Sequence, residues 1–316
     1  MPANSEPWGI YRGTGCPGTG TDDWPDPPAW RSFGGGPDLP APQADDPYAS
    51  VLLGDPAHPL PPVPEEVDRV NAALFLSRPL LVTGEPGTGK SALAYRISRE
   101  LGLGRVLRWQ ITSLSTLHEG LYAGAGRLGP LGTAFLPHRT PRVLLIDRLD
   151  RADIALPEDL CTVLTTGGFS LPHAAPGGGA RLAPDDDPAA TVPLSGGEVR
   201  CHAFPVLVIT TGGDRDLPHD LVSRCVSLRM PRPTPEFLRA VAAARFPDGD
   251  SARAPAPDVV DAFLERAADA EGRVVERFLD ALQLAVDGVL SALAADGRGW
   301  PEAVDTLWRW TAAEEP

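Results

Sequence analysis

The eight residues GEPGTGKS, at positions 84–91, have the types and the spacing that bind the phosphates of a nucleotide. Glycines let the backbone wrap around phosphates, so that successive N–H groups and the start of a following helix face the negative charge. In this spacing Lys90 reaches the β- and γ-phosphates, and the Ser91 hydroxyl ligates Mg²⁺. A chance glycine-rich turn is the alternative, but an apolar strand precedes this segment and a helical pattern follows it. The sequence therefore predicts ATP and Mg²⁺ as cofactors, with a nucleotide site built from Gly84, Glu85, Pro86, Gly87, Thr88, Gly89, Lys90, Ser91 and Ala92.

A second functional candidate is Asp147, which ends the apolar run in LLIDRLDRAD. The run predicts a buried strand that delivers this carboxylate to the metal, so Ser91 and Asp147 are the predicted metal-binding pair. The next residue is Arg148, where a nucleotide-hydrolysing enzyme usually places a glutamate. Arginine has no acceptor and stays protonated, so it can stabilise phosphate charge but cannot take a proton from water. We therefore expect slow or absent hydrolysis.

The elements that must position these residues form an α/β pattern. Residues 64–76 start with Pro-Glu-Glu and carry apolar residues at helical spacing, which predicts a helix. Short apolar strands and further helices then alternate, and this order is typical of a parallel sheet. The predicted strands are 79–83, 106–112, 143–147 and 204–211, with a second helix at 91–103.

The composition excludes several classes of function. The chain has 316 residues, 42% of them hydrophobic, which is enough for one large core and a smaller second domain. A net charge of -14 argues against nucleic-acid binding as the main activity, because nucleic-acid surfaces require Lys and Arg. No apolar run approaches the roughly 20 residues that span a bilayer, so no membrane segment is expected. The scattered cysteines, Cys16, Cys161, Cys201 and Cys225, are typical of reduced thiols in a cytoplasmic protein.

Changes in composition divide the chain into three parts. Residues 1–63 are rich in Pro and Gly and predict an N-terminal arm, which either wraps on the folded body or stays a disordered tail. Residues 64–231 predict the nucleotide-binding domain, with 169–202 as a loop or hairpin insertion. Residues 232–316 carry a helical pattern to the end and predict a separate helical domain.

Taken together, these motifs resemble those of the AAA+ ATPases, and within them the MoxR-like branch. The resemblance covers residues 64–290, where VNAAL, GEPGTGKS, GPLGTAFLP, LLIDRLDRAD and LVSRCVSL occur in the family's order. GPL ahead of the second acidic strand is the feature most suggestive of MoxR relatives. The resemblance implies a three-layer P-loop NTPase fold with a parallel sheet, the AAA+ core, followed by a small all-α lid domain. It also implies a ring of subunits, expected to be a hexamer, that acts as a chaperone-like remodelling or regulatory factor with a protein containing a von Willebrand factor A domain.

Functional positions of the family transfer to this sequence one by one. Lys90 and Asp147 match the phosphate-binding lysine and the metal carboxylate. Arg224, in VSRC, corresponds to the arginine that reaches into a neighbouring subunit's site. Arg273 is the first candidate for the nucleotide-sensing arginine of the lid, and Arg277 is the second. A position as an ordinary surface arginine is the alternative for both Arg224 and Arg273.

Two departures from the family fall on the activation of water. One is Arg148, and the other is Gly212, which stands after the fourth core strand where the family has a polar residue, usually Asn. Loss of a positioned base typically slows a reaction about 10²- to 10⁴-fold. Asp150, Glu85 or Asp214 could supply a carboxylate from another direction, and only the geometry decides whether one of them does.

Three functions stay open at this point. The first is a MoxR-like AAA+ ATPase that remodels a partner with weak or lost hydrolysis. The second is a non-hydrolysing, nucleotide-gated scaffold in which ATP holds subunits together through Arg224. The third is a nucleotide or small-molecule kinase that uses only the phosphate loop, which the separate helical domain and the position of Arg224 disfavour.

Overall fold

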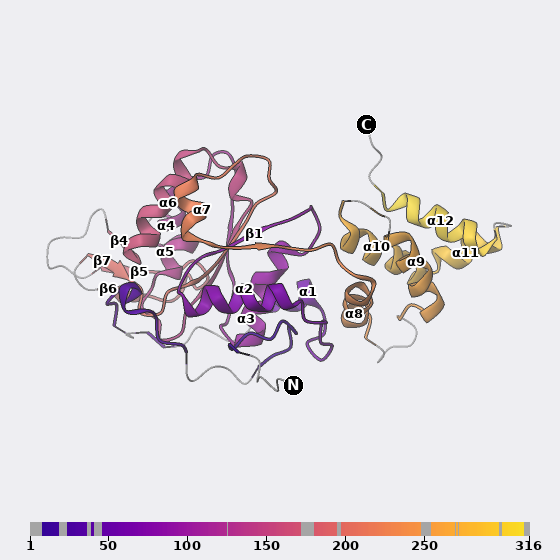
Figure 1. Ribbon diagram of the computed structural model, residues 1–316, viewed down its shortest axis with the longest axis horizontal. Helices are drawn as coiled ribbons and strands as arrows, with labels where there is room; N and C mark the ends of the chain where they lie inside the picture. Colours follow the sequence, from indigo (N-terminus) through magenta and orange to yellow (C-terminus); the bar gives the residue numbers. More distant parts are fainter. Residues whose placement is uncertain are drawn as a thin grey trace, which may run out of the picture.

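A five-stranded parallel sheet forms the centre of the larger part of the protein (Figure 1). The computed structural model describes residues 8–18, 24–36, 39–40, 46–124, 126–171, 180–194, 197–247, 254–268, 270, 272–296 and 299–312. The strand order is β2 (Leu107–Gln110), β3 (Val143–Asp147), β8 (Val206–Thr210), β1 (Leu80–Thr83) and β9 (Val226–Arg229). Every neighbouring pair is parallel, so each connection has to cross over a face of the sheet. Four of these strands confirm the sequence prediction, and the edge strand β9 is an addition to it.

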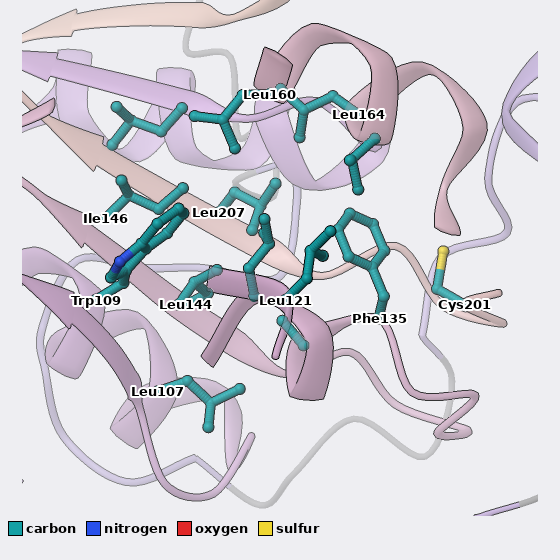
Figure 2. Packing of buried hydrophobic residues seen from close by; sticks show 14 of the residues in the cluster. Leu107, Trp109, Leu121, Phe135, Leu144, Ile146, Leu160, Leu164, Cys201 and Leu207 are labelled. Atoms are coloured by element: carbon teal, nitrogen blue, oxygen red, sulfur yellow. The ribbon is translucent and has the colours of Figure 1, made fainter. Parts of the chain in front are cut away.

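Both faces of the sheet are covered by helices, because the side chains of the three central strands alternate between two hydrophobic clusters. Leu144 and Ile146 of β3 enter one cluster, and Val143 and Leu145 enter the other. Figure 2 shows the first cluster, where Leu160 lies over the side chains of the strands. Its helices are α4 (Leu117–Leu121), α5 (Pro130–Ala134), α6 (Ala155–Thr166) and α7 (His219–Arg224), and those of the other face are α1 (Pro47–Leu53), α2 (Pro64–Phe75) and α3 (Lys90–Leu101).

Two small antiparallel strand pairs lie between α6 and β8. β4 (Gly168–Ser170) pairs with β7 (Glu198–Arg200), and β5 (Ala180–Leu182) pairs with β6 (Val192–Leu194). This is the segment 169–202 for which the sequence left a loop and a hairpin open. Residues 172–179 and 195–196 of it lie outside the described residues.

The N-terminal arm is joined to the core by buried polar contacts. Tyr11 is fully buried, and its hydroxyl donates to Glu66 of α2 at 2.8 Å. The N–H of Tyr11 donates to the side chain of Asn71 at 3.0 Å, and the Glu100 carboxylate of α3 accepts further backbone N–H groups of the arm. Residues 8–18 therefore hold α2 and α3 together, while the arm also supplies the short helix η1 (Ala29–Arg31) and helix α1.

The C-terminal part is a separate helical domain that follows β9 (Figure 1). It consists of α8 (Pro235–Arg245), α9 (Pro257–Ala268), α10 (Val274–Val286), α11 (Val289–Ala295) and α12 (Trp300–Trp310), which share a hydrophobic cluster of their own. Within the described ranges, no single helix has the length and apolar composition to cross a membrane; α10 and α11 meet these criteria only as a pair bent by 65°. The predicted α/β fold class is confirmed: a three-layer core with a parallel central sheet and a phosphate loop after β1, followed by a small all-α domain.

Candidate nucleotide-binding site

The phosphate loop connects β1 to α3 at the carboxyl edge of the sheet. Gly84, Gly87 and Gly89 have φ angles of 137°, 77° and 85°, which glycine adopts without the strain of a side chain. At Gly87 an added Cβ would lie 2.4 Å from the Cα of Arg273, so the helical domain approaches the loop closely there. At Gly89, no atom of the described residues other than its two chain neighbours lies within 4 Å of such a Cβ. The first turn of α3 therefore opens onto space where an anion can meet the backbone N–H groups.

Lys90 is the only lysine in the sequence, and it is buried in the first turn of α3. Its ammonium donates to the carbonyl oxygens of Gly84 and Glu85 at 2.7 and 2.8 Å. Burial lowers the pKa of Lys90, and the nearby charge of Arg148 lowers it further, while neighbouring carboxylates act in the opposite direction. A bound phosphate would stabilise the charged form of this amine, so the surroundings of Lys90 fit a nucleotide.

Ser91 and Asp147 lie together, as a metal site requires. The Ser91 hydroxyl donates to Asp147 Oδ1 at 2.8 Å, and the hydroxyl of Thr210, at the end of β8, donates to the same oxygen at 2.8 Å. Oxygen donors of this kind suit Mg²⁺, which keeps several water ligands and takes other ligands from phosphate oxygens. In the described part of the chain no group of three or more His, Cys, Asp or Glu side chains could hold a metal. In the sequence, the only feature that points to Thr210 is that it is a hydroxyl residue at the end of an apolar strand.

Arg148 has a backbone conformation that is rare for a side-chain-bearing residue. Its φ is 66°, and its N–H donates to the Thr210 hydroxyl at 2.9 Å. Its guanidinium is 2.5 Å from Asp214 Oδ2 and 3.4 Å from Asp150 Oδ1. A Cβ added at Gly212 would lie 2.8 Å from the Arg148 guanidinium carbon. The two departures from the family pattern are therefore coupled, because the missing side chain at Gly212 leaves the room that Arg148 fills.

The three carboxylates that could replace the missing glutamate are all paired with arginines. Asp150 is buried, and its Oδ2 accepts the N–H groups of Gly212 and Asp214, each at 3.0 Å. Burial alone raises the pKa of Asp150, but these two hydrogen bonds and the Arg148 charge together bring it below its ordinary value. Asp214 pairs with Arg148, and Glu85 pairs with Arg232 at 2.9 Å. Asp150, with its lowered pKa, is therefore a poor proton acceptor.

Arg224 lies at the edge of the sheet opposite to the phosphate loop. It precedes β9, whose first residue Val226 pairs with Leu80 at the start of β1, whereas the loop follows the end of β1. The Arg224 guanidinium donates to Thr165 at 2.8 Å and pairs with Asp220 at 3.2 Å. The structure therefore does not bring Arg224 into the nucleotide site of its own chain.

The two candidate arginines of the helical domain have different surroundings. Arg273 precedes α10, and its backbone lies against Gly87 of the phosphate loop. Its exposed side chain pairs with Glu276 at 3.1 Å. Arg277 instead lies 4.1 Å above the ring of Trp308 and donates to the carbonyl of that residue at 2.9 Å. Arg273 is thus the candidate beside the loop, and Arg277 belongs to the interior contacts of the helical domain.

Comparisons with known proteins give a distant likeness in fold. No family model matches the chain, and no curated protein matches it. Solved structures similar to it include NtrX from Brucella abortus in complex with ADP, at 14% identity and a TM-score of 0.41, over 71% of this chain and 50% of that chain. Another is the Thermotoga maritima RuvB Holliday junction branch migration motor, at 16% identity and a TM-score of 0.46, over 78% of this chain and 67% of that chain. The chain thus spans half of the NtrX chain, and the function has to be argued from the site itself.

Proposed function

We propose that this protein binds ATP with Mg²⁺ at the phosphate loop and hydrolyses it slowly or not at all. The loop, Lys90 and the Ser91–Asp147 pair supply the groups that hold phosphate and metal. The observation that carries the proposal is the pairing of Asp150 and Asp214 with Arg148. It leaves a guanidinium, which cannot accept a proton, at the place where a base would have to stand. When bound, Mg²⁺ would neutralise phosphate charge and orient the terminal phosphate.

We further propose that the protein acts as an oligomeric, MoxR-like AAA+ factor in which nucleotide binding, more than turnover, controls assembly. The position of Arg224 supports this, because it lies too far along the sheet to serve its own loop and is exposed enough to meet a neighbour's. A hexameric ring and a partner with a von Willebrand factor A domain follow from the sequence resemblance. The competing form of the same idea is a chaperone-like ATPase with weak turnover.

The unique lysine gives a direct test of nucleotide binding. Acetylation with a succinimidyl ester modifies only Lys90 and the amine at the N-terminus, which serves as an internal control. ATP with Mg²⁺, at ten times its dissociation constant, is expected to slow the modification of Lys90 about tenfold, because only the free fraction reacts. Mass spectrometry of the two amines measures this. Equal modification of Lys90 with and without ATP would contradict the proposal.

Replacement of Lys90 tests the same site by calorimetry. Lys90→Ala is expected to weaken ATP binding about 100-fold, because it removes charge-assisted hydrogen bonds to two phosphates. Arg239→Ala is the matched control, since it removes an exposed cation that pairs with Asp261 at 2.7 Å in the helical domain. Unchanged affinity in Lys90→Ala would place the nucleotide elsewhere.

A further inference from the structure

Arg148 has one buried and one exposed acidic partner. Asp150 is fully buried and is also held by two backbone N–H groups, so it keeps its place whatever Arg148 does. Asp214 is 59% exposed, its pair with Arg148 lies at the rim of the site, and the Arg148 side chain itself is 30% exposed. Ion pairs at exposed positions are typically weak, because water screens both charges. The Arg148–Asp214 contact is therefore the one that a stronger anion can replace.

The end of the nucleotide's phosphate chain would bring such an anion to Arg148. Arg148 follows Asp147, and Asp147 contacts Ser91, next to Lys90 in the phosphate loop. Each of the two cations is thus the chain neighbour of one member of the Ser91–Asp147 pair, whose side chains meet at 2.8 Å. A terminal phosphate held at this pair would come within reach of both. A diphosphate reaches the loop but lacks the group that would extend toward Arg148.

We propose that Arg148 determines the specificity of the site for a nucleoside triphosphate by exchanging Asp214 for the terminal phosphate. This inference rests on the proposed nucleotide site and goes beyond it, because it gives the residue that replaces the base a positive role. A guanidinium can make two parallel hydrogen bonds to a phosphate, and the Nη2 group that contacts Asp214 is the one that the exchange would redirect. The more highly charged anion and the less exposed position favour the phosphate.

The surrounding contacts limit the exchange to side chains. The N–H groups of Gly212 and Asp214 stay on the buried Asp150, so the backbone after β8 keeps its position. Only the Asp214 carboxylate loses its partner and turns to solvent. The missing side chain at Gly212 leaves the guanidinium room to shift between its two positions. Triphosphate binding would therefore place a free negative charge on the exposed loop at 214.

Calorimetric titration of the full chain with Mg²⁺ and either ADP or the β,γ-imido analogue of ATP tests this exchange. Arg148→Gln is expected to weaken binding of the analogue about 10- to 100-fold and to leave ADP binding within about threefold, because only the analogue carries the terminal phosphate. Asp214→Asn is expected to strengthen binding of the analogue about threefold, since it removes the competing carboxylate. The Asp214→Asn effect should vanish in the Arg148→Gln background, which isolates the pair from other consequences of either change.

Asp261→Asn provides the matched control, because it breaks an exposed Arg–Asp pair in the helical domain. Unchanged ADP binding in Arg148→Gln shows that the altered chain is folded. Equal loss of ADP and analogue binding in Arg148→Gln, no loss of either, or an Asp214→Asn effect that persists without Arg148 would overturn the exchange while leaving the nucleotide site in place. Binding of neither nucleotide by the unaltered chain would overturn both proposals together.

Discussion

Arg148→Glu is expected to raise the single-turnover rate of ATP cleavage about 10²- to 10⁴-fold. The change puts a carboxylate after Asp147, whose own position is fixed by hydrogen bonds from Ser91 and Thr210. Asp214 would then face the new carboxylate in place of an arginine, and this like charge raises the pKa of the introduced carboxylate toward the range of an effective base. Rapid mixing of excess protein with labelled ATP and Mg²⁺ measures the rate.

The matched control for this change is Arg148→Gln, which removes the same positive charge and adds no base. It is expected to hydrolyse ATP no faster than the unaltered chain. If Arg148→Gln and Arg148→Glu raised the rate equally, Arg148 would act as an electrostatic obstacle, and the missing base would not explain the slow reaction. A Lys90→Ala change in the Arg148→Glu background should abolish the gain, which ties the activity to the phosphate loop.

Arg96→Met is expected to lower the free energy of unfolding by about 3–5 kcal/mol. Arg96 Nη2 lies 2.7 Å from Glu66 Oε2, and the two side chains are 3% and 1% exposed. Without the arginine, Glu66 is a buried carboxylate whose remaining donor is the Tyr11 hydroxyl. Urea denaturation of the full chain, followed by circular dichroism, measures the loss.

Two further variants separate the buried charge from the loss of packing. Arg69→Met removes a partner of Glu65 at 3.9 Å, on the exposed side of the same helix α2, and is expected to cost less than about 0.5 kcal/mol. The double change Arg96→Met with Glu66→Met is expected to be more stable than Arg96→Met alone, because an apolar pair leaves no unpaired charge. If the double change were the less stable of the two, packing would dominate at this position.

The sequence sufficed for the parts of the site that depend on residue type and local spacing. The phosphate loop requires glycines, a lysine and a hydroxyl residue within 84–91, and these signals are unambiguous in one stretch of chain. The alternation of apolar strands and helices likewise predicted the parallel α/β sheet. The edge strand β9, Val226–Arg229, was not among the predicted strands. Helix α1 escaped prediction because Pro47–Leu53 lies within a Pro- and Gly-rich region.

The contacts that decide the chemistry could not be predicted, because they join segments far apart in the chain. Asp147 and Thr210 meet only because β3 and β8 are neighbours in the sheet. The sequence left Asp150 and Asp214 open as substitute bases, and their pairing with Arg148 emerges only from the fold. Gly212 leaves room for the guanidinium of Arg148, which comes from a distant segment of the chain. This relation likewise follows only from the fold.

The most direct test of the central claim combines occupancy and turnover in one sample of the unaltered protein. Excess protein is mixed with labelled ATP and Mg²⁺, and both the modification of Lys90 and the formation of ADP are followed over time. We expect ATP to protect Lys90 while ADP forms no faster than in Lys90→Ala. Rapid ADP formation that disappears in Lys90→Ala would contradict the claim and show that this site hydrolyses ATP despite Arg148.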